Sequence, residues 1–184
     1  MKISVGTPGS GIFFNAMDIL DAVSLTLEDI QPQYLDVAQT MEALEAGTID
    51  GAFLVTGCPS QALQALEQKI NFRVIPIEGP IAERVLTSCS FYDVHTIPAG
   101  TYKNQLTDIR TLAVRATLVV SADMPKDQVY EITKAVFGSR DALRSCNPRG
   151  VELAPETVAK DMTIPFHPGA IKYYDQENIS LRNQ

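Results

Sequence analysis

The segment Gly6–Gly11 has residue types suited to holding an anion. It reads Gly-Thr-Pro-Gly-Ser-Gly and lies between a short apolar run, Lys2–Val5, and a helical pattern that starts at Ile12. The first N–H groups of a helix lack partners within the helix and carry a partial positive charge, so they attract carboxylates and phosphates. Thr7 and Ser10 add hydroxyl groups, and the glycines let a ligand approach the backbone. The alternative is a tight turn in which Ser10 only caps the helix.

The spacing of this segment excludes two nucleotide-binding motifs. The turn lacks the Gly-Lys-Ser/Thr ending of a Walker A loop, and Gly6, Gly9 and Gly11 do not follow the GxGxxG pattern. A small carboxylate or phosphate therefore fits the turn better than a nucleotide does.

A second turn of similar character is Thr56–Ser60, which reads Thr-Gly-Cys-Pro-Ser. It follows a buried-looking strand, Gly51–Val55, and precedes a helical pattern. In a parallel sheet both turns lie at the carboxyl ends of their strands, where open α/β folds bind ligands. We therefore expect the two turns to converge, although each residue type also suits an ordinary loop.

Other residues are weaker candidates. Cys58 precedes a helix, a place that activates thiols, and His95 would be its base, but no third group orients the pair. His167, between two prolines, is interpreted as a structural or surface residue. Tyr34 and Tyr102 follow extended segments, from which they reach a cleft or pack in the core.

The elements that position these residues alternate between strand-like and helix-like runs up to about residue 90. This βαβαβαβα order predicts a mainly parallel sheet covered by helices. The expected strands are Lys2–Val5, Gln33–Leu35, Gly51–Val55 and Phe72–Ile77. The expected helices start near Ile12, cover Ala38–Ala46, follow Pro59, and cover Pro80–Leu86.

The pattern changes in the second half of the chain. Phe91–Thr96 is expected to be extended, Pro98–Ile109 to be a loop, and Leu112–Ser121 to be a long strand. Lys126–Arg144 predicts the longest helix, and Ala170–Gln176 a short helix within an irregular, proline-containing tail. The best domain boundary lies near residue 110, which gives domains of residues 1–110 and 111–184.

The composition narrows the possible partners. The chain has 184 residues, a net charge of −7 and a pI of about 4.8, so nucleic acid is an unexpected partner. Its three cysteines form no disulfide framework or zinc spacing, and no cofactor is expected. No apolar run is long enough to span a bilayer, and no export signal is recognisable. The chain is therefore expected to be cytoplasmic, or a mature or truncated part of an exported protein.

Five segments together carry a family resemblance. They are Val5–Gly11, Gly47–Phe53, Thr96–Tyr102 (TIPAGTY), Leu118–Pro125 and Ile164–Ala170 (which contains HPGA). In this order they resemble segments of TRAP transporter solute receptors of the TAXI type, and they extend over nearly the whole chain. TIPAGTY and HPGA are the most specific of these segments.

The resemblance implies an α/β fold of the type II periplasmic binding protein kind, with a ligand between two lobes. Residues 1–110 would be the second lobe, with a parallel or mixed sheet, and residues 111–184 would return to the first lobe. The implied function is the capture of a small organic acid or amino acid, without catalysis, for a TRAP permease, and the implied location is the periplasm. The implied ligand-binding residues are Thr7, Gly9, Ser10, Gly11, Tyr34, Thr56, Gly57 and Pro59.

Two departures from the family pattern keep alternatives open. Ile12 and Phe13 follow the glycine turn where the family usually has Thr and a polar residue. Residue 1 also corresponds to the start of the second lobe, so we expect most of the first lobe to be absent and the chain to associate with itself. The alternatives are a folded, truncated or degenerate receptor without a ligand, and an enzyme on a related two-lobed scaffold.

Overall fold

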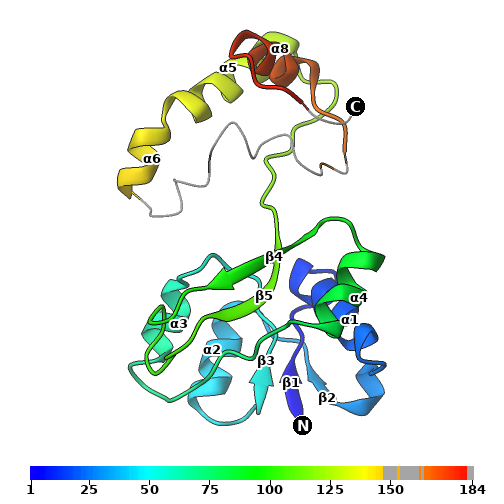
Figure 1. Ribbon diagram of the computed structural model, residues 1–184, viewed down its shortest axis with the longest axis vertical. Coiled ribbons are helices and arrows are strands. Elements are labelled where there is room, and N and C mark those ends of the chain that lie inside the picture. The colour runs from blue at the N-terminus through cyan, green and yellow to red at the C-terminus, as the bar shows by residue number, and fades with distance from the viewer. Residues whose placement is uncertain (147–152, 154–161, 163, 182–184) are drawn as a thin grey trace. The chain divides into compact units, whose positions relative to one another are not determined.

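The computed structural model describes residues 1–146, 153, 162 and 164–181. The chain divides into two compact units, Met1–Val114 and Arg115–Gln184 (Figure 1). The first unit contains all the strands found in the described residues, and the described part of the second unit is helical.

A three-stranded parallel sheet forms the centre of the first unit. Its order is β2 (Gln31–Gln33), β1 (Lys2–Ser4) and β3 (Gly51–Ala52), so the first strand of the chain is the middle one (Figure 1). Ser4 and Val5 are fully buried. The Ser4 hydroxyl is 2.8 Å from the hydroxyl of Thr40, so this buried polar pair is satisfied.

Helices follow the strands of this sheet. They are α1 (Gly11–Ala22), the 3-10 helix η1 (Leu27–Asp29), α2 (Val37–Glu45), α3 (Gln61–Leu66) and α4 (Pro80–Ser88). Asp36 caps α2 by accepting a hydrogen bond from the Gln39 N–H, at 2.8 Å. Gly47 follows α2 with a φ of 64°, a conformation that favours glycine at the end of a helix.

An antiparallel pair of strands completes the first unit. β4 (Tyr92–Ile97) pairs with β5 (Ile109–Val114) from Tyr92 opposite Val114 to Ile97 opposite Ile109. Tyr92 also belongs to the core cluster of Ala22 and Val85, which joins α1, α4 and β4. Burial of this apolar surface is the main force that holds the three elements together.

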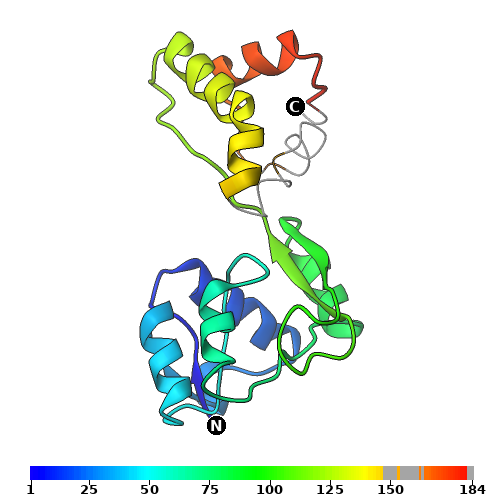
Figure 2. The same cartoon turned by 90° about the vertical axis from the view of Figure 1, so that its left-hand side faces the viewer.

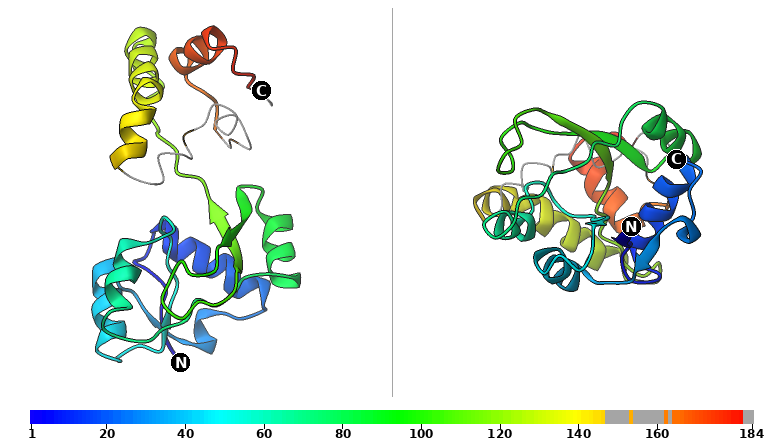
Figure 3. Two further views of the ribbon diagram at one scale, coloured as in Figure 1. Left: turned by 60° about the vertical axis from the view of Figure 1, so that its left-hand side comes forward. Right: turned by 90° about the horizontal axis from the view of Figure 1, so that it is seen from below.

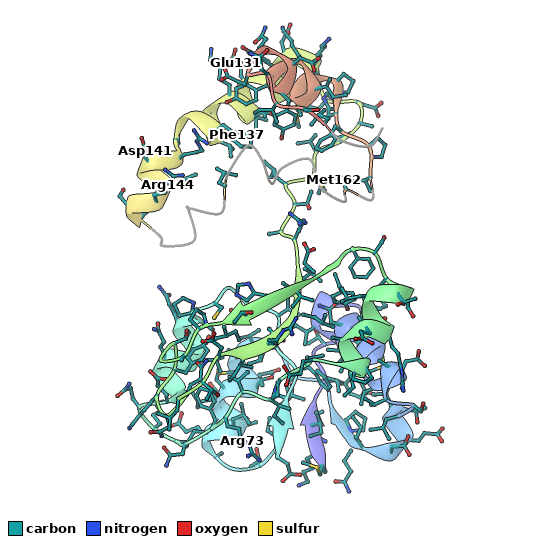
Figure 4. All side chains as sticks on the ribbon, viewed as in Figure 1. Arg73, Glu131, Phe137, Asp141, Arg144 and Met162 are labelled. Carbon is teal, nitrogen blue, oxygen red and sulfur yellow. The ribbon has the colours of Figure 1, made fainter. Side chains whose placement is uncertain are left out.

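The second unit is built from α5 (Lys126–Gly138), α6 (Arg140–Cys146) and α8 (Pro168–Gln176). α8 lies beside α5 in Figures 2 and 3, and Phe137, Tyr173 and Tyr174 form the buried cluster between them. α6 is exposed, and in Figure 4 it carries Asp141 and Arg144, whose charged groups are 3.6 Å apart.

One expected strand is wrong and two are too long. Phe72–Ile77 forms no strand, because Pro76 lacks an N–H group and the described backbone pairing is limited to the Ile77 N–H donating to the Arg110 carbonyl at 3.0 Å. The strand expected at Leu112–Ser121 ends at Val114, because the partner strand β4 begins opposite that residue. The strand expected at Gly51–Val55 is likewise limited to its first two residues, and the Phe53 N–H adds one further bond to the Ser4 carbonyl at 2.8 Å.

The helix expected at Lys126–Arg144 is interrupted at Ser139, directly after Gly138, a poor helix former. α8 is confirmed two residues longer than expected at its start. Most of the tail before residue 164 lies outside the described residues. The α/β class is confirmed, with one parallel and one antiparallel sheet. Among the described residues, no helix has the length and apolar character needed to cross a bilayer.

Candidate functional site

The three parallel strands end at one edge of their sheet, and the predicted site residues follow these ends. Gly6–Gly11 follows β1, Tyr34 follows β2, and Thr56–Ser60 comes four residues after β3 (Figure 1). We call these three segments the carboxyl edge. Because β1 pairs in parallel with both neighbours, the three segments follow the strands at their carboxyl ends, as expected from the sequence.

The first turn is held in a fixed shape by its own hydrogen bonds. The Ser10 N–H donates to the Thr7 carbonyl at 3.0 Å, and the Ser10 hydroxyl accepts from the Phe13 N–H at 3.1 Å. Gly6 is buried with a φ of 80°, and a Cβ atom there would lie 2.7 Å from the Cβ of Ile12. The turn therefore depends on glycine at this position for both conformation and space. The interpretation of Ser10 as a helix cap is confirmed.

The same turn leaves groups available to a ligand. Thr7, Gly9 and Gly11 are exposed, and Ser10 is half-buried. In the described part of the chain, no hydrogen-bond partner occurs for the N–H groups of Gly11 and Ile12, at the start of the 12-residue helix α1. Such groups attract negative charge, so the cap and the anion site are compatible. Anion binding itself stays a prediction.

The second turn is partly exposed and partly locked. Thr56, Gly57 and Pro59 are exposed, whereas Ser60 has only 5% of its surface exposed. The Thr56 hydroxyl donates to the Ser60 hydroxyl at 3.3 Å, and the Cys58–Pro59 peptide bond is cis. The exposed part of this turn is thus followed directly by a buried residue, Ser60.

Tyr102 holds the second turn through hydrogen bonds, and this role was not predicted from the sequence. Its hydroxyl accepts a hydrogen bond from the Ser60 N–H at 2.9 Å and donates to the Cys58 sulfur at 3.9 Å. Tyr102 is 5% exposed. Burial raises the pKa of its hydroxyl, and the hydrogen bond from Ser60 acts in the opposite direction. The signal available in the sequence was the TIPAGTY segment that ends at this residue.

Aromatic rings accompany the first turn. The Phe13 ring centroid lies 5.8 Å from that of Phe14 and 6.3 Å from that of Tyr34. Phe14 is 57% exposed and Tyr34 is 46% exposed. Tyr34 therefore belongs to an aromatic group that borders the first turn, and no structural contact joins it to the second turn among the described interactions.

Two surface cavities lie elsewhere in the first unit. One, of about 440 Å³, is lined by α2, the start of β1, the end of β2 and the residues before β3, and the other, of about 430 Å³, lies between α1 and α4. Neither is lined by a residue of the first or second turn.

A buried polar network borders the cavity between α1 and α4. The Tyr92 hydroxyl is 2.7 Å from an Asp18 carboxylate oxygen and 2.9 Å from the Asn15 side-chain oxygen. Burial raises the pKa of Tyr92 above its usual range, and the hydrogen bond to Asp18 and the charge of Asp18 raise it further. In the chain as described, no cluster of histidine, cysteine and acidic side chains is suited to a metal ion.

The two histidines are accounted for within the secondary structure. His95 lies in β4 opposite Thr111. His167 caps α8, because its Nδ1 atom accepts a hydrogen bond from the Gly169 N–H at 3.1 Å. The structural interpretation of His167 is therefore confirmed. The HPGA segment has a packing role, in which Pro168 occupies the first turn of α8 and Gly169 contacts α5.

Comparison with known protein families identifies one match that covers most of the chain. Residues 1–177 match the NMT1-like family, a family of periplasmic binding protein-like solute receptors. Both turns, Tyr34, Tyr102 and the helices of the second unit fall within this match. The resemblance to solute receptors is confirmed at this level, and the chain belongs to the NMT1-like family.

Proposed function

We propose that the protein is the substrate-binding component of a TRAP-type transporter, of the TAXI type, and binds a small organic acid or amino acid without catalysis. The observation that carries this proposal is the common carboxyl edge, where Thr7, Gly9, Ser10, Gly11, Tyr34, Thr56, Gly57 and Pro59 follow the ends of three parallel strands. Membership of the NMT1-like family supports the binding of a solute.

The carboxylate is proposed to lie at the start of α1. Gly11 and Ile12 offer N–H groups there, and the exposed Thr7 offers a hydroxyl group. A helix start stabilises a nearby negative charge by ~0.3–1 kcal/mol when exposed, and by up to about 2 kcal/mol when partly buried. Because Thr7, Gly9 and Gly57 are exposed, we propose that a second lobe covers the ligand in the functional receptor, as in two-lobed binding proteins.

Partners and location follow from the same proposal. The receptor would deliver its ligand to TRAP permease subunits and would function in the periplasm. Self-association is a further proposal, supported by Leu118 and Val119, which are 70% and 64% exposed in an extended segment without secondary structure. Light scattering at micromolar protein concentration tests it, and a monomeric mass would contradict it.

A thermal-shift screen with succinate, malate, L-aspartate and L-glutamate tests ligand binding. The expected result is a concentration-dependent rise in melting temperature with at least one compound, because a ligand of the folded state stabilises it. Ser10→Leu should abolish this rise by filling the first turn. Thr26→Leu is the matched control, because Thr26 caps η1 by accepting from the Glu28 N–H and lies outside the carboxyl edge.

The second candidate is a folded family member that binds no ligand. It is favoured by the apolar and aromatic start of α1, where Ile12, Phe13 and Phe14 offer no polar side chain next to the turn. In that case no compound shifts the melting temperature, and the two variants differ from the native protein only by their loss of a helix cap.

A further inference from the structure

The second turn has a buried support that comes from a distant part of the chain. Tyr102 lies 42 residues after Ser60, and its hydroxyl binds the Ser60 backbone and the Cys58 sulfur at the same time. Ser60 directly precedes α3 and is buried, so its N–H group needs a hydrogen-bond partner within the protein. The Tyr102 hydroxyl is that partner.

Tyr102 is itself held in place by contacts that do not involve its hydroxyl. Its N–H donates to the Gln105 side-chain oxygen at 3.3 Å, and the Lys103 N–H donates to the Glu67 carboxylate at 2.7 Å, just after α3. The Phe72 ring lies 6.1 Å from the Tyr102 ring. The loop therefore attaches to both ends of α3.

The loop between β4 and β5 is also braced internally. The Gln105 side-chain nitrogen lies 3.1, 2.9 and 3.1 Å from the carbonyl oxygens of Ile97, Pro98 and Thr107, which share its two hydrogens. Gly100 has a φ of 77°, and its N–H donates to the Gln105 carbonyl at 2.8 Å. A rigid loop of this kind presents the Tyr102 hydroxyl at one position.

We propose that Tyr102 is a positioning residue, which fixes the second turn so that Thr56 and Gly57 face the ligand of the carboxyl edge. The part of this inference that concerns a ligand rests on the proposed function. The part that says Tyr102 fixes the shape of the second turn does not depend on any ligand. It assigns the TIPAGTY segment a role in shaping a binding surface that it does not line.

The first test compares Tyr102→Phe with Tyr92→Phe. Both tyrosines are 5% exposed and both hydroxyls are hydrogen-bonded, but Tyr92 contacts Asn15 and Asp18 instead of the second turn. Alkylation by iodoacetamide is followed at each cysteine separately by mass spectrometry. Loss of the hydroxyl that bonds both Ser60 and Cys58 predicts an increase of about fivefold in the rate at Cys58 in Tyr102→Phe, with Cys146 unchanged. Tyr92→Phe should leave the rate at Cys58 unchanged.

Two results of this test would overturn the proposal. One is an unchanged rate at Cys58 in Tyr102→Phe. The other is an equal increase at Cys58 and Cys89, because that pattern indicates general destabilisation of the fold. Amide exchange in the native protein provides a test without any variant. The Ser60 N–H should exchange much more slowly than the exposed Gly57 N–H, and equal rates would contradict the role of Tyr102.

A second test measures the binding of succinate and L-glutamate by titration calorimetry. Where the native protein binds either probe, Tyr102→Phe should weaken the affinity by about fivefold and Tyr92→Phe should not change it. Equal affinities of Tyr102→Phe and the native protein would overturn the positioning role. Where the native protein binds neither probe, the proposed function loses support. The Cys58 rate then decides the positioning role alone, since it requires no ligand.

Discussion

Gly169 lies so close to α5 that a Cβ atom on it would come within 2.8 Å of the Tyr130 amide nitrogen. The same atom would lie 2.8 Å from the Val129 Cβ and would also clash with the Lys126 carbonyl oxygen. Backbone atoms cannot move away as a flexible side chain does. The contact therefore explains why the second residue of α8 is a glycine.

We expect Gly169→Ala to destabilise the second unit by about 1–3 kcal/mol, because the added methyl group overpacks the contact between α8 and α5. Near-UV circular dichroism during urea unfolding measures this change through Tyr173 and Tyr174, as the chain has no tryptophan. Gly138→Ala is the control. A Cβ atom at Gly138 meets nothing within 4 Å, so this variant should not lose stability. Equal stability of the two variants would contradict the contact.

The first turn offers a second matched pair of glycines. Gly6 and Gly9 have φ angles of 80° and 79°, but only at Gly6 would a Cβ atom contact other groups, including Ile12 at 2.7 Å and Ser10 at 2.9 Å. We expect Gly9→Ala to lose ~1–2 kcal/mol from the left-handed conformation alone, and Gly6→Ala to lose more. Urea unfolding of the first unit measures both. A larger loss at Gly9 would show that conformation, not space, governs this turn.

The hydrogen bond that caps α8 predicts how substitutions of His167 change the stability of the second unit. His167→Ala removes the acceptor of the Gly169 N–H and should cost about 0.5–2 kcal/mol of stability. His167→Asn should retain most of it, because asparagine is a strong cap. The free energy of unfolding of the second unit distinguishes these variants. If both lose the same amount, the imidazole ring contributes through packing and not through its hydrogen bond.

Tyrosine burial predicts a loss of stability at alkaline pH. Burial raises the pKa of Tyr92, Tyr102, Tyr173 and Tyr174 in the folded protein, whereas the unfolded chain releases these protons near pH ~10. Above that pH the folded state holds more protons than the unfolded state, so the free energy of unfolding falls as the pH rises. Below it, both states are protonated and these groups cause no pH dependence.

Tyr92→Phe should reduce this alkaline loss, since it removes one of the four groups. Each such group contributes a slope of at most about 1.4 kcal/mol per pH unit. Urea unfolding between about pH 8 and about pH 11 measures the slope. An identical slope in Tyr92→Phe and the native protein would mean that Tyr92 is not held protonated by the fold.

Local signals were sufficient to predict the β1–turn–α1 unit. The apolar run at residues 2–5, the glycines of the turn and the cap at Ser10 act within a few residues of one another. The positions of both turns after the carboxyl ends of parallel strands also followed from the alternation of strands and helices, because parallel strands need crossover connections.

Non-local partners explain what the sequence left open. The apolar pattern at residues 112–121 continues beyond Val114, but a strand needs a partner, and β4 provides none before Tyr92, its first residue, which pairs with Val114. The bond between Tyr102 and Ser60 joins residues 42 positions apart, and no local pattern signals such a pair. Sequence patterns thus indicated where the turns lie, but not what holds the second one.

The arrangement of β1, β2 and β3 has a consequence for synthesis of the chain. All three strands lie within the first 52 residues, so their sheet has its pairing partners early in translation. The second turn, in contrast, lacks its anchor until the loop with Tyr102 has left the ribosome. We expect the nascent chain to form its first turn well before its second. Only the nearly complete first unit then carries both turns of the carboxyl edge.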